Sequence, residues 1–320
     1  MKPDRSSFIG MDEAGYGPNL GPLLLTVTCW QVPGLATEFD FPAALTPIVS
    51  TQGTDNGQRL HIADSKQVFV GKQGFASLER SALALLRAAG VPVQSFHQLW
   101  NHLTGNADGH IAKCAPWYHD DLLLPVVADA GHIDQLSGLL IERMNQTGVT
   151  LCSLQGDVVV EERFNQLATA IGSNKSLALS RLALALLKRV WQDDGTCPTL
   201  FVGDKHGGRN RYDELLAEIA DGLFITRLEE GRVISRYRIG NTELRFQMKG
   251  EQHLPVACAS IIAKYVRELA MDQFNLFWGK QCDGVKPTRG YPVDAKRFRM
   301  AIEPAMKQLE IDESLLWRKL

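Results

Sequence analysis

The amino-acid sequence predicts a mixed α/β fold, and two patterns support this class. Strand-like segments open the chain, segments with helical spacing of apolar residues lie between them, and three further strand-like segments follow in the C-terminal half. This order is typical of a sheet that is covered by helices. The 320 residues are 45% apolar and 22% charged, which is ordinary for a globular protein and excludes a disordered or collagen-like chain.

The N-terminal half is expected to begin with two paired strands. Residues 8–12 are a short apolar run that ends in acid, and residues 23–32 are rich in Leu, Val and Thr, with glycines and a proline between them. Such a turn signal between two strand-like runs predicts a hairpin. Residues 33–57 are expected to form a loop, and residues 75–89 have apolar residues at helical spacing. Residues 95–156 give mixed signals and form an enlarged middle segment.

The C-terminal half has clearer patterns. Helices are expected over residues 174–191 and from 257 to about 278, because their apolar residues recur at helical spacing. A short strand is expected over residues 199–203. Strands are also expected over residues 223–228, 232–239 and 242–249, with glycines in the turns between them. A helical tail is expected to end the chain.

Charge and cysteine usage limit the classes of function. The 34 Lys and Arg against 36 Asp and Glu give a net charge of −2, which excludes a globally basic nucleic-acid coat but not a local basic face. The six cysteines form no CxxC pair, as expected for reduced thiols. The sequence has no signal-peptide h-region and no apolar run of membrane length. We therefore expect a cytoplasmic protein that uses no membrane.

Four acidic residues stand at informative positions. Asp12, followed by Glu13, and Asp204 come at the ends of strand-like segments, and Glu268 lies in the last long helical pattern. Carboxylates that meet in space repel one another, which raises their pKa values unless a cation neutralises them. Mg²⁺ prefers such oxygen ligands, and two such ions can act together in phosphodiester hydrolysis. Taken alone, an Asp-Glu pair after a strand is more often a turn and a helix cap.

Four segments together resemble the type 2 ribonucleases H, the ribonuclease HII and HIII family. MDEAGYGP at residues 11–18 resembles the family's DEAGRG signature, and ADSK at residues 63–66 resembles its DSK segment. CASIIAKYVRE at residues 258–268 is similar to its AASIxAKVxRD helix, and GYP at residues 290–292 to its GYP turn. The four occur in the family's order, so their combination is far more specific than any one of them.

The resemblance implies a fold, a reaction and a set of site residues. It implies a ribonuclease H-like fold in one domain over residues 1–320, with a central mixed sheet, helices on both sides and a C-terminal helical segment over residues 257–320. The implied reaction is hydrolysis of the RNA strand of an RNA–DNA hybrid duplex by two Mg²⁺ or Mn²⁺ ions, with 3′-hydroxyl and 5′-phosphate products and no organic cofactor. The implied catalytic residues and metal ligands are Asp12, Glu13, Asp204 and Glu268, and the implied substrate contacts are Gly15, Tyr16, Gly17, Lys66, Lys264 and Tyr291.

Two positions depart from the ribonuclease HII pattern. Tyr16 stands where the family has Arg between two glycines, in a loop that senses the 2′-hydroxyl at an RNA–DNA junction; this hydroxyl distinguishes RNA from DNA. Glu268 stands where ribonuclease HII has Asp, as in ribonuclease HIII. Two alternatives therefore stay open: a catalytically lapsed relative that binds structured nucleic acid, and a nuclease for DNA junctions.

Basic residues offer two further candidates. Arg232, Arg236 and Arg238 alternate with apolar residues along one strand, and Arg245 and Lys249 do so along the next. Such a face could follow a phosphate backbone, but a solvated sheet face is the favoured interpretation because no aromatic residue lies among the cations. The second candidate is a cluster around Tyr291, made of Lys286, Arg289, Lys296, Arg297 and Arg299. A loop histidine such as His206 is expected to be incidental.

Overall fold

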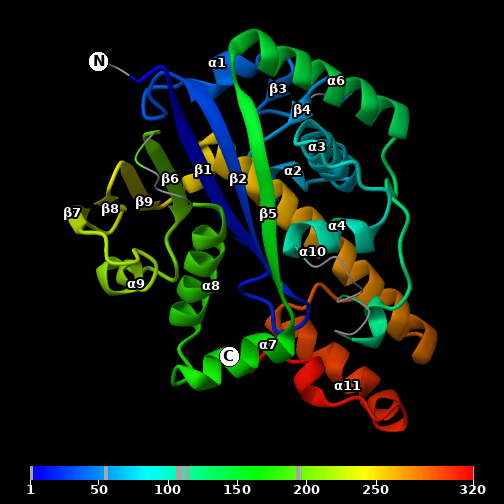
Figure 1. The fold of residues 1–320 in the computed structure, drawn as a ribbon. Coiled ribbons are helices and arrows are strands. Elements are labelled where there is room, and N and C mark those ends of the chain that lie inside the picture. The colour runs from blue at the N-terminus through cyan, green and yellow to red at the C-terminus, as the bar shows by residue number, and fades with distance from the viewer. Residues whose placement is uncertain are drawn as a thin grey trace.

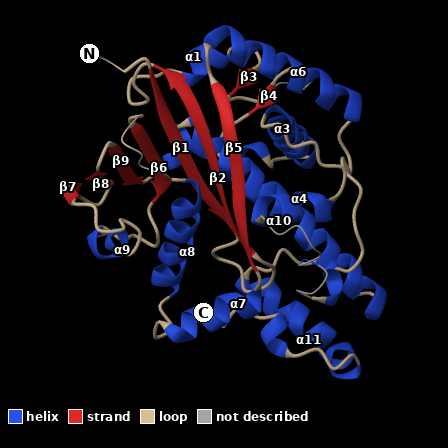
Figure 2. Cartoon of the chain, viewed as in Figure 1, coloured by secondary structure: helices blue, strands red, loops and turns tan. Residues whose placement is uncertain are grey.

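The computed structural model describes residues 3–53, 57–105, 111, 115–191, 195 and 197–319. A central sheet in this part of the chain has the order β5-β2-β1-β6-β9-β8-β7 (Figures 1 and 2). Its strands are β1 (Arg5–Ala14), β2 (Leu23–Pro33), β5 (Thr150–Val159), β6 (Thr199–Asp204), β7 (Ile225–Glu230), β8 (Ile234–Ile239) and β9 (Thr242–Gln247). The β1–β6 and β6–β9 pairs are parallel and the other pairs are antiparallel, so the sheet is mixed.

Helices cover both faces of this sheet. The long helix α10 (Leu254–Gln281) crosses β1 and β2 on one face, and α8 (Lys175–Val190) packs on the other, nearer the viewer in Figure 1. The described residues also form the helices α1 (Phe41–Leu45), α2 (Ser65–Val68), α3 (Gly74–Ala88), α4 (Phe96–Thr104), α6 (Ala130–Thr147), α7 (Glu161–Ala170), α9 (Asp213–Ala217) and α11 (Pro292–Gln308). Three short 3-10 helices are η1 (Pro116–Tyr118), η2 (Gly250–Gln252) and η3 (Glu313–Leu315).

Close packing of α10 on the sheet depends on small residues. A Cβ atom at Gly10 would lie 2.3 Å from the carbonyl carbon of Pro255, so β1 and α10 can approach this closely only with glycine at that position. The hydroxyls of Thr26 and Thr28 donate hydrogen bonds to the carbonyls of Ala259 and Pro255, at 2.6 and 2.7 Å. These contacts fix α10 along the two strands from which the candidate site is built.

The predicted fold class is confirmed. The hairpin of β1 and β2, the strand β6, the β7–β8–β9 meander and the helices α3, α8 and α10 lie where apolar periodicity predicts them. The structure also has the central mixed sheet, the helices on both sides and the C-terminal helical segment expected from the resemblance. The assignment of all 320 residues to one domain stays a prediction.

The predicted loop over residues 33–57 is wrong in part. It contains the short helix α1 and strand β3 (Val49–Ser50), which pairs in parallel with β4 (Leu60–His61) in a separate small sheet. Residues 54–56 lie outside the described residues. Two-residue strands carry too little periodicity to be recognised, and tertiary packing defines them.

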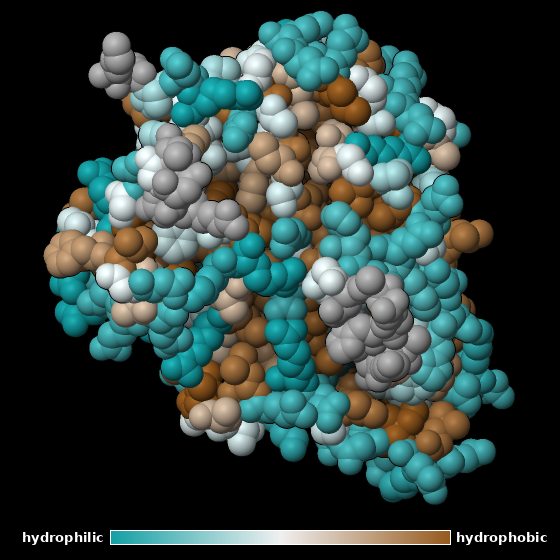
Figure 3. Space-filling view, in the orientation of Figure 1, coloured by the Kyte–Doolittle hydropathy of each residue, from teal (hydrophilic) through white to brown (hydrophobic). Residues whose placement is uncertain are grey.

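The middle segment supplies an edge of the central sheet. It contains α4, η1, α6 and most of β5, which pairs antiparallel with β2; residues 106–110 and 112–114 lie outside the described part. In Figure 3, apolar side chains gather in the middle of the visible face, where β1, β2 and β5 lie in Figure 1, and hydrophilic side chains surround them. Among the described residues, no helix has the length and apolar character needed to cross a bilayer.

Candidate active site

Two of the predicted acids lie side by side at the ends of parallel strands. Met11 of β1 pairs with Gly203 of β6, so Asp12 and Asp204 are the next residues along the two strands. Asp12 faces α10, and Asp204 faces η2, which directly precedes α10 in the sequence. Ser260 of α10 forms a side-chain hydrogen bond with Asp12, and the backbone N–H of Gly250 in η2 donates to Asp204 Oδ1 at 3.3 Å. The parallel β1–β6 pair therefore brings together two carboxylates that are 192 positions apart in the sequence.

Glu13 joins the two aspartates electrostatically. Strand alternation turns it to the other face of β1, where its charge acts on Tyr16 and Tyr212. Burial, followed by the charges of Asp12 and Asp204, raises the pKa of Glu13. Burial is also the main cause that raises the pKa of Asp12, with Asp204 adding to it, and it raises the pKa of Asp204. We call Asp12, Glu13 and Asp204 the acid cluster: like charges held together in a poorly solvated place.

The predicted DSK segment lies against the acid cluster. Asp64 caps α2 by accepting a hydrogen bond from the Lys66 N–H at 2.9 Å. The charge of Lys66 lowers the pKa of Glu13 and of Asp204 against the larger effect of burial. A hydrogen bond of 2.9 Å joins the hydroxyls of Ser65 and Ser260 and ties this segment to α10. Lys66 is exposed and is therefore available to a phosphate beside the acids.

Glu268 has a different environment from the other three acids. Its side chain is 1% exposed and forms ion pairs with Lys264 at 2.5 Å and with Arg289 at 2.8 Å. It lies eight residues after Ser260, which is about 12 Å along a helix axis. Lys264 lies four residues before Glu268 on the same face of α10, as helical spacing predicts. This contact gives Lys264 a partner within the protein, which argues against its use as a free phosphate contact.

The acid cluster has the donor chemistry of a site for hard divalent cations. Its oxygens are the ligand type that Mg²⁺ and Mn²⁺ prefer, and its mutual repulsion is what such a cation would relieve. Among the residues that the structure describes, no group of three or more His, Cys, Asp or Glu side chains is arranged closely enough to hold a metal ion. The oxygen ligands of the acid cluster are thus of the type that fits the ion, but their side chains are not arranged in a coordination geometry.

The predicted glycine loop and GYP turn are in contact. The carbonyl of Gly290 accepts hydrogen bonds from the N–H groups of Asn19 and Leu20, at 2.8 and 3.3 Å. A Cβ atom on the exposed Gly17 would lie 4.0 Å from the ring of Tyr291. The Tyr291 side chain is 54% exposed at the start of α11. Because Ser260 links Asp12 to Ser65, all four family-like segments meet in one region of the fold.

Tyr16 is held within this loop by its own contacts. Its ring is half-buried, and Lys175 Nζ lies 4.7 Å from the ring centre, within the range of a cation–π contact. Burial raises the pKa of its hydroxyl. Tyr16 therefore brings an aromatic face and an adjacent ammonium group to a position where the ribonuclease HII pattern has a guanidinium.

Sequence reasoning missed the arginine that supports the glycine loop. Arg318 is 1% exposed, and its Nη2 donates hydrogen bonds of 2.5 Å to the carbonyls of both Gly15 and Pro18. Glu161 accepts from the Gly21 N–H at 2.7 Å, and Arg267 donates to the Leu20 carbonyl at 3.1 Å. An arginine about 300 positions from the loop has no local sequence signal, so no pattern could have identified it.

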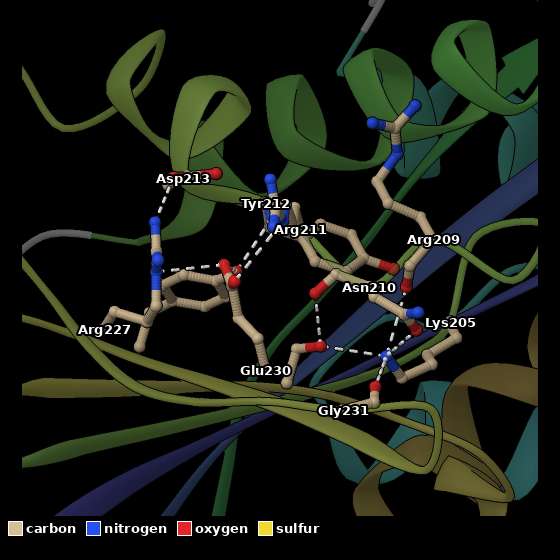
Figure 4. Close-up of polar contacts among 11 residues, drawn as sticks. Lys205, Arg209, Asn210, Arg211, Tyr212, Asp213, Arg227, Glu230 and Gly231 are labelled. Carbon is tan, nitrogen blue, oxygen red and sulfur yellow. Dashed lines mark hydrogen bonds and ion pairs between the residues drawn. The ribbon is translucent and has the colours of Figure 1, made fainter.

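The segment after Asp204 is anchored by Lys205 (Figure 4). Its ammonium group donates to the carbonyls of Arg209 and Gly231 at 3.1 and 2.7 Å, and to the Ser235 hydroxyl at 2.9 Å.

His206 is 4% exposed and contacts Ser180 through Nδ1 at 3.2 Å. Burial lowers the pKa of its ring to about 3. His206 is therefore a core histidine, which agrees with the expectation that it is incidental.

Solved structures that are similar to this chain include three of ribonucleases. For ribonuclease H2 from Pyrococcus horikoshii OT3, identity is 14% and the TM-score is 0.47, with 97% of this chain and 92% of that chain covered. For ribonuclease HII in its complex with PCNA from Archaeoglobus fulgidus, the values are 14% and 0.41, with 98% and 94% covered. For Bst-RNase HIII in complex with Mn²⁺ they are 15% and 0.40, with 98% and 66% covered. No protein-family model and no curated protein matches the chain.

Proposed function

We propose that this protein is a divergent type 2 ribonuclease H, a metal-dependent endoribonuclease that hydrolyses the RNA strand of RNA–DNA hybrids. The observation that carries the proposal is the convergence of the four family-like segments, which span residues 11 to 292, on the acid cluster. Segments that merely shared a composition with the family would have no reason to contact one another in space.

The residues of the cluster divide into roles that follow from their contacts. Asp12, Glu13 and Asp204 would hold Mg²⁺ or Mn²⁺, which when bound supplies charge neutralisation and an activated water for phosphodiester hydrolysis. Ser260 holds the Asp12 side chain in place through its hydrogen bond. Lys66, exposed beside the acids, would bind a phosphate oxygen of the strand.

Two further roles follow from the surrounding segments. Gly15, Tyr16, Gly17 and Tyr291 would contact the ribose, because the glycine loop and the exposed tyrosine lie together. Glu268 stays in the proposed ligand set on the strength of the resemblance. To join the set, its carboxylate has to exchange its ion pairs with Lys264 and Arg289 for a metal ion.

Replacing Asp12 tests the proposal directly. Asp12→Asn keeps the size of the side chain and removes its charge. Cleavage of a hybrid with labelled RNA should fall by about 10²- to 10³-fold or more in Mg²⁺ and in Mn²⁺, a loss of the size expected for a central electrostatic contact. Binding of the uncut hybrid should stay largely intact. Undiminished cleavage by Asp12→Asn would count against the assignment.

Tyr16 and the ion-paired Glu268 favour a second candidate function. A relative that has lost catalysis would bind structured nucleic acid at the same region without cutting it. Incubation of the wild-type protein with labelled hybrid, with and without Mn²⁺, separates the two, since tight binding without products supports the lapsed relative. An all-DNA junction in the same assay tests a DNA nuclease, which would cut it as readily as the hybrid.

A further inference from the structure

A pocket of about 710 Å³ opens beside the acid cluster. We call it the side pocket; its walls come from residues 42–52, 59–67 and 249–257. It adjoins the cluster because Asp64 and Glu251, on its walls, act on the charges of Asp204 and Asp12. Its volume lies within the range of about 300–1,000 Å³ that is usual for small-ligand pockets. The side pocket is therefore large enough for one nucleotide.

Two cations on the pocket wall form no ion pair with any residue that the structure describes. Arg59 and Lys249 line the side pocket and are both exposed. In the part of the chain that the structure describes, neither side chain forms an ion pair or a hydrogen bond. Their charges are therefore available to an anion in the pocket.

Lys249 is also held in an unusual backbone conformation. Its φ is +59°, in the left-handed region, although it is not a glycine. Such a conformation is unfavourable for a residue with a Cβ atom, and residues of this kind concentrate at functional sites. The next residue, Gly250, donates its N–H to Asp204. The strained turn thus connects the pocket wall directly to the acid cluster.

The rest of the lining suits a nucleobase and its sugar. Ile62 and Leu254 form buried apolar parts of the wall, and Gln52, Gln67 and Gln252 bring amide groups to it. Amides can donate to and accept from base edges, while the apolar wall can pack against the base. Of the two acids, Asp64 already accepts from the N–H of Lys66 as the cap of α2, and Glu251 lies toward the acid cluster.

We propose that the side pocket binds one nucleotide of the strand that is cut, next to the scissile phosphodiester, with its phosphate between Arg59 and Lys249 and its base against Ile62 and Leu254. This deepens the proposed function and rests on it for the identity of the strand. The binding of a nucleotide at this place can nevertheless be measured without any catalysis.

Calorimetric titration with adenosine 3′,5′-bisphosphate tests the pocket without added metal. The wild-type protein should bind this probe, and Arg59→Gln/Lys249→Gln should weaken binding by about tenfold or more, because each charge-assisted contact to phosphate is worth about that factor. Arg232→Gln/Lys319→Gln is the matched control: it removes the same charge from two exposed cations elsewhere and should bind as the wild type does. Adenosine should bind more weakly than the bisphosphate, and inorganic phosphate should compete.

The outcomes separate the pocket from the nuclease. No saturation by the wild type up to about 10 mM probe, or equal losses in the pocket variant and its control, overturns the inference. Probe binding that depends on Arg59 and Lys249, in a protein that cuts no hybrid, supports nucleotide binding by the pocket and contradicts the proposed nuclease activity. Hybrid cleavage whose KM is the same in the wild type and the pocket variant supports the nuclease and overturns the pocket.

Discussion

The cations of the β8–β9 pair and those of the side pocket differ in whether a described acid forms an ion pair with them. On the β8–β9 pair, Arg236 and Arg245 lie 2.8 Å from Glu243, and Arg238 lies 3.8 Å from it. At the side pocket, Arg59 and Lys249 have no such acid within the described residues. A surface can attract phosphate only through charge that the folded protein does not already neutralise. The pairing therefore favours a solvated sheet face for the meander and an anion site for the pocket.

The neighbouring turn repeats the paired pattern. Arg211 and Arg227 both approach Glu230, at 3.7 and 3.2 Å, and Lys205 is surrounded by carbonyl and hydroxyl oxygens (Figure 4). Cations in this part of the fold thus stabilise the protein itself.

Arg318 is the most deeply buried of the partnered cations and should have the largest effect. Arg318→Met removes the donor to Gly15 and Pro18 and leaves Glu161 without one of its compensating charges. The free energy of unfolding should fall by about 3 kcal/mol, as measured by urea denaturation. The exposed neighbour Lys319→Met should change it little. A loss below about 0.5 kcal/mol would show that the loop does not depend on this arginine.

Glu161 beneath the loop should make stability depend on pH. Burial raises the pKa of its carboxyl to about 7 from an ordinary value of 4.5. Between these values the folded protein holds a proton that the unfolded chain releases. The free energy of unfolding should therefore fall as pH rises through this window, by up to about 1.4 kcal/mol per unit. Glu161→Gln should flatten the profile; equal slopes for both proteins in urea titrations at about pH 5, 6 and 7 would contradict the assignment.

Glu243 is the acid that the arginines of the β8–β9 pair share. Glu243→Gln leaves Arg236 and Arg245 without their shared partner, and these are 35% and 20% exposed. We expect a loss of about 1 kcal/mol in the free energy of unfolding, because solvent screens part of the interaction. The same change should strengthen binding of hybrid duplex at low salt and steepen its salt dependence. If neither binding nor its salt slope changes, the pairing does not explain why this face is unavailable.

Lys66 and Lys264 allow the finest test of the comparison, since the resemblance assigns both to substrate. Lys66→Gln should reduce the slope of log affinity against log salt by about 1, the effect of one lost phosphate contact. Lys264→Gln should leave that slope unchanged and lower stability by removing the partner of the buried Glu268. Hybrid binding measured over a range of salt concentrations, with urea denaturation beside it, gives both values. Equal slopes of log affinity against log salt for the two variants would contradict the inference that Lys66, but not Lys264, contacts a phosphate.

The sequence alone predicted the longer elements and named acids that the structure brings close together. Periodicity predicted β1, β2, α8 and α10 because their apolar faces are continuous over many residues. The segment at residues 11–18 supplied Asp12 and Glu13, and the end of the strand-like run at residues 199–203 supplied Asp204. Helices and strands of this kind depend on residues that are close together in the sequence, so they can be predicted from the sequence pattern alone.

Only the tertiary structure decided which charged side chains form ion pairs with other described residues and which do not. Glu268 could not be known to face Arg289, nor Arg318 to lie under a loop 300 positions away, because such contacts depend on how helices pack on the sheet. The small β3–β4 sheet and the strained turn at Lys249 depend on the same packing. The strength of an ion pair falls with distance and with exposure to water, and both quantities exist only in the folded chain.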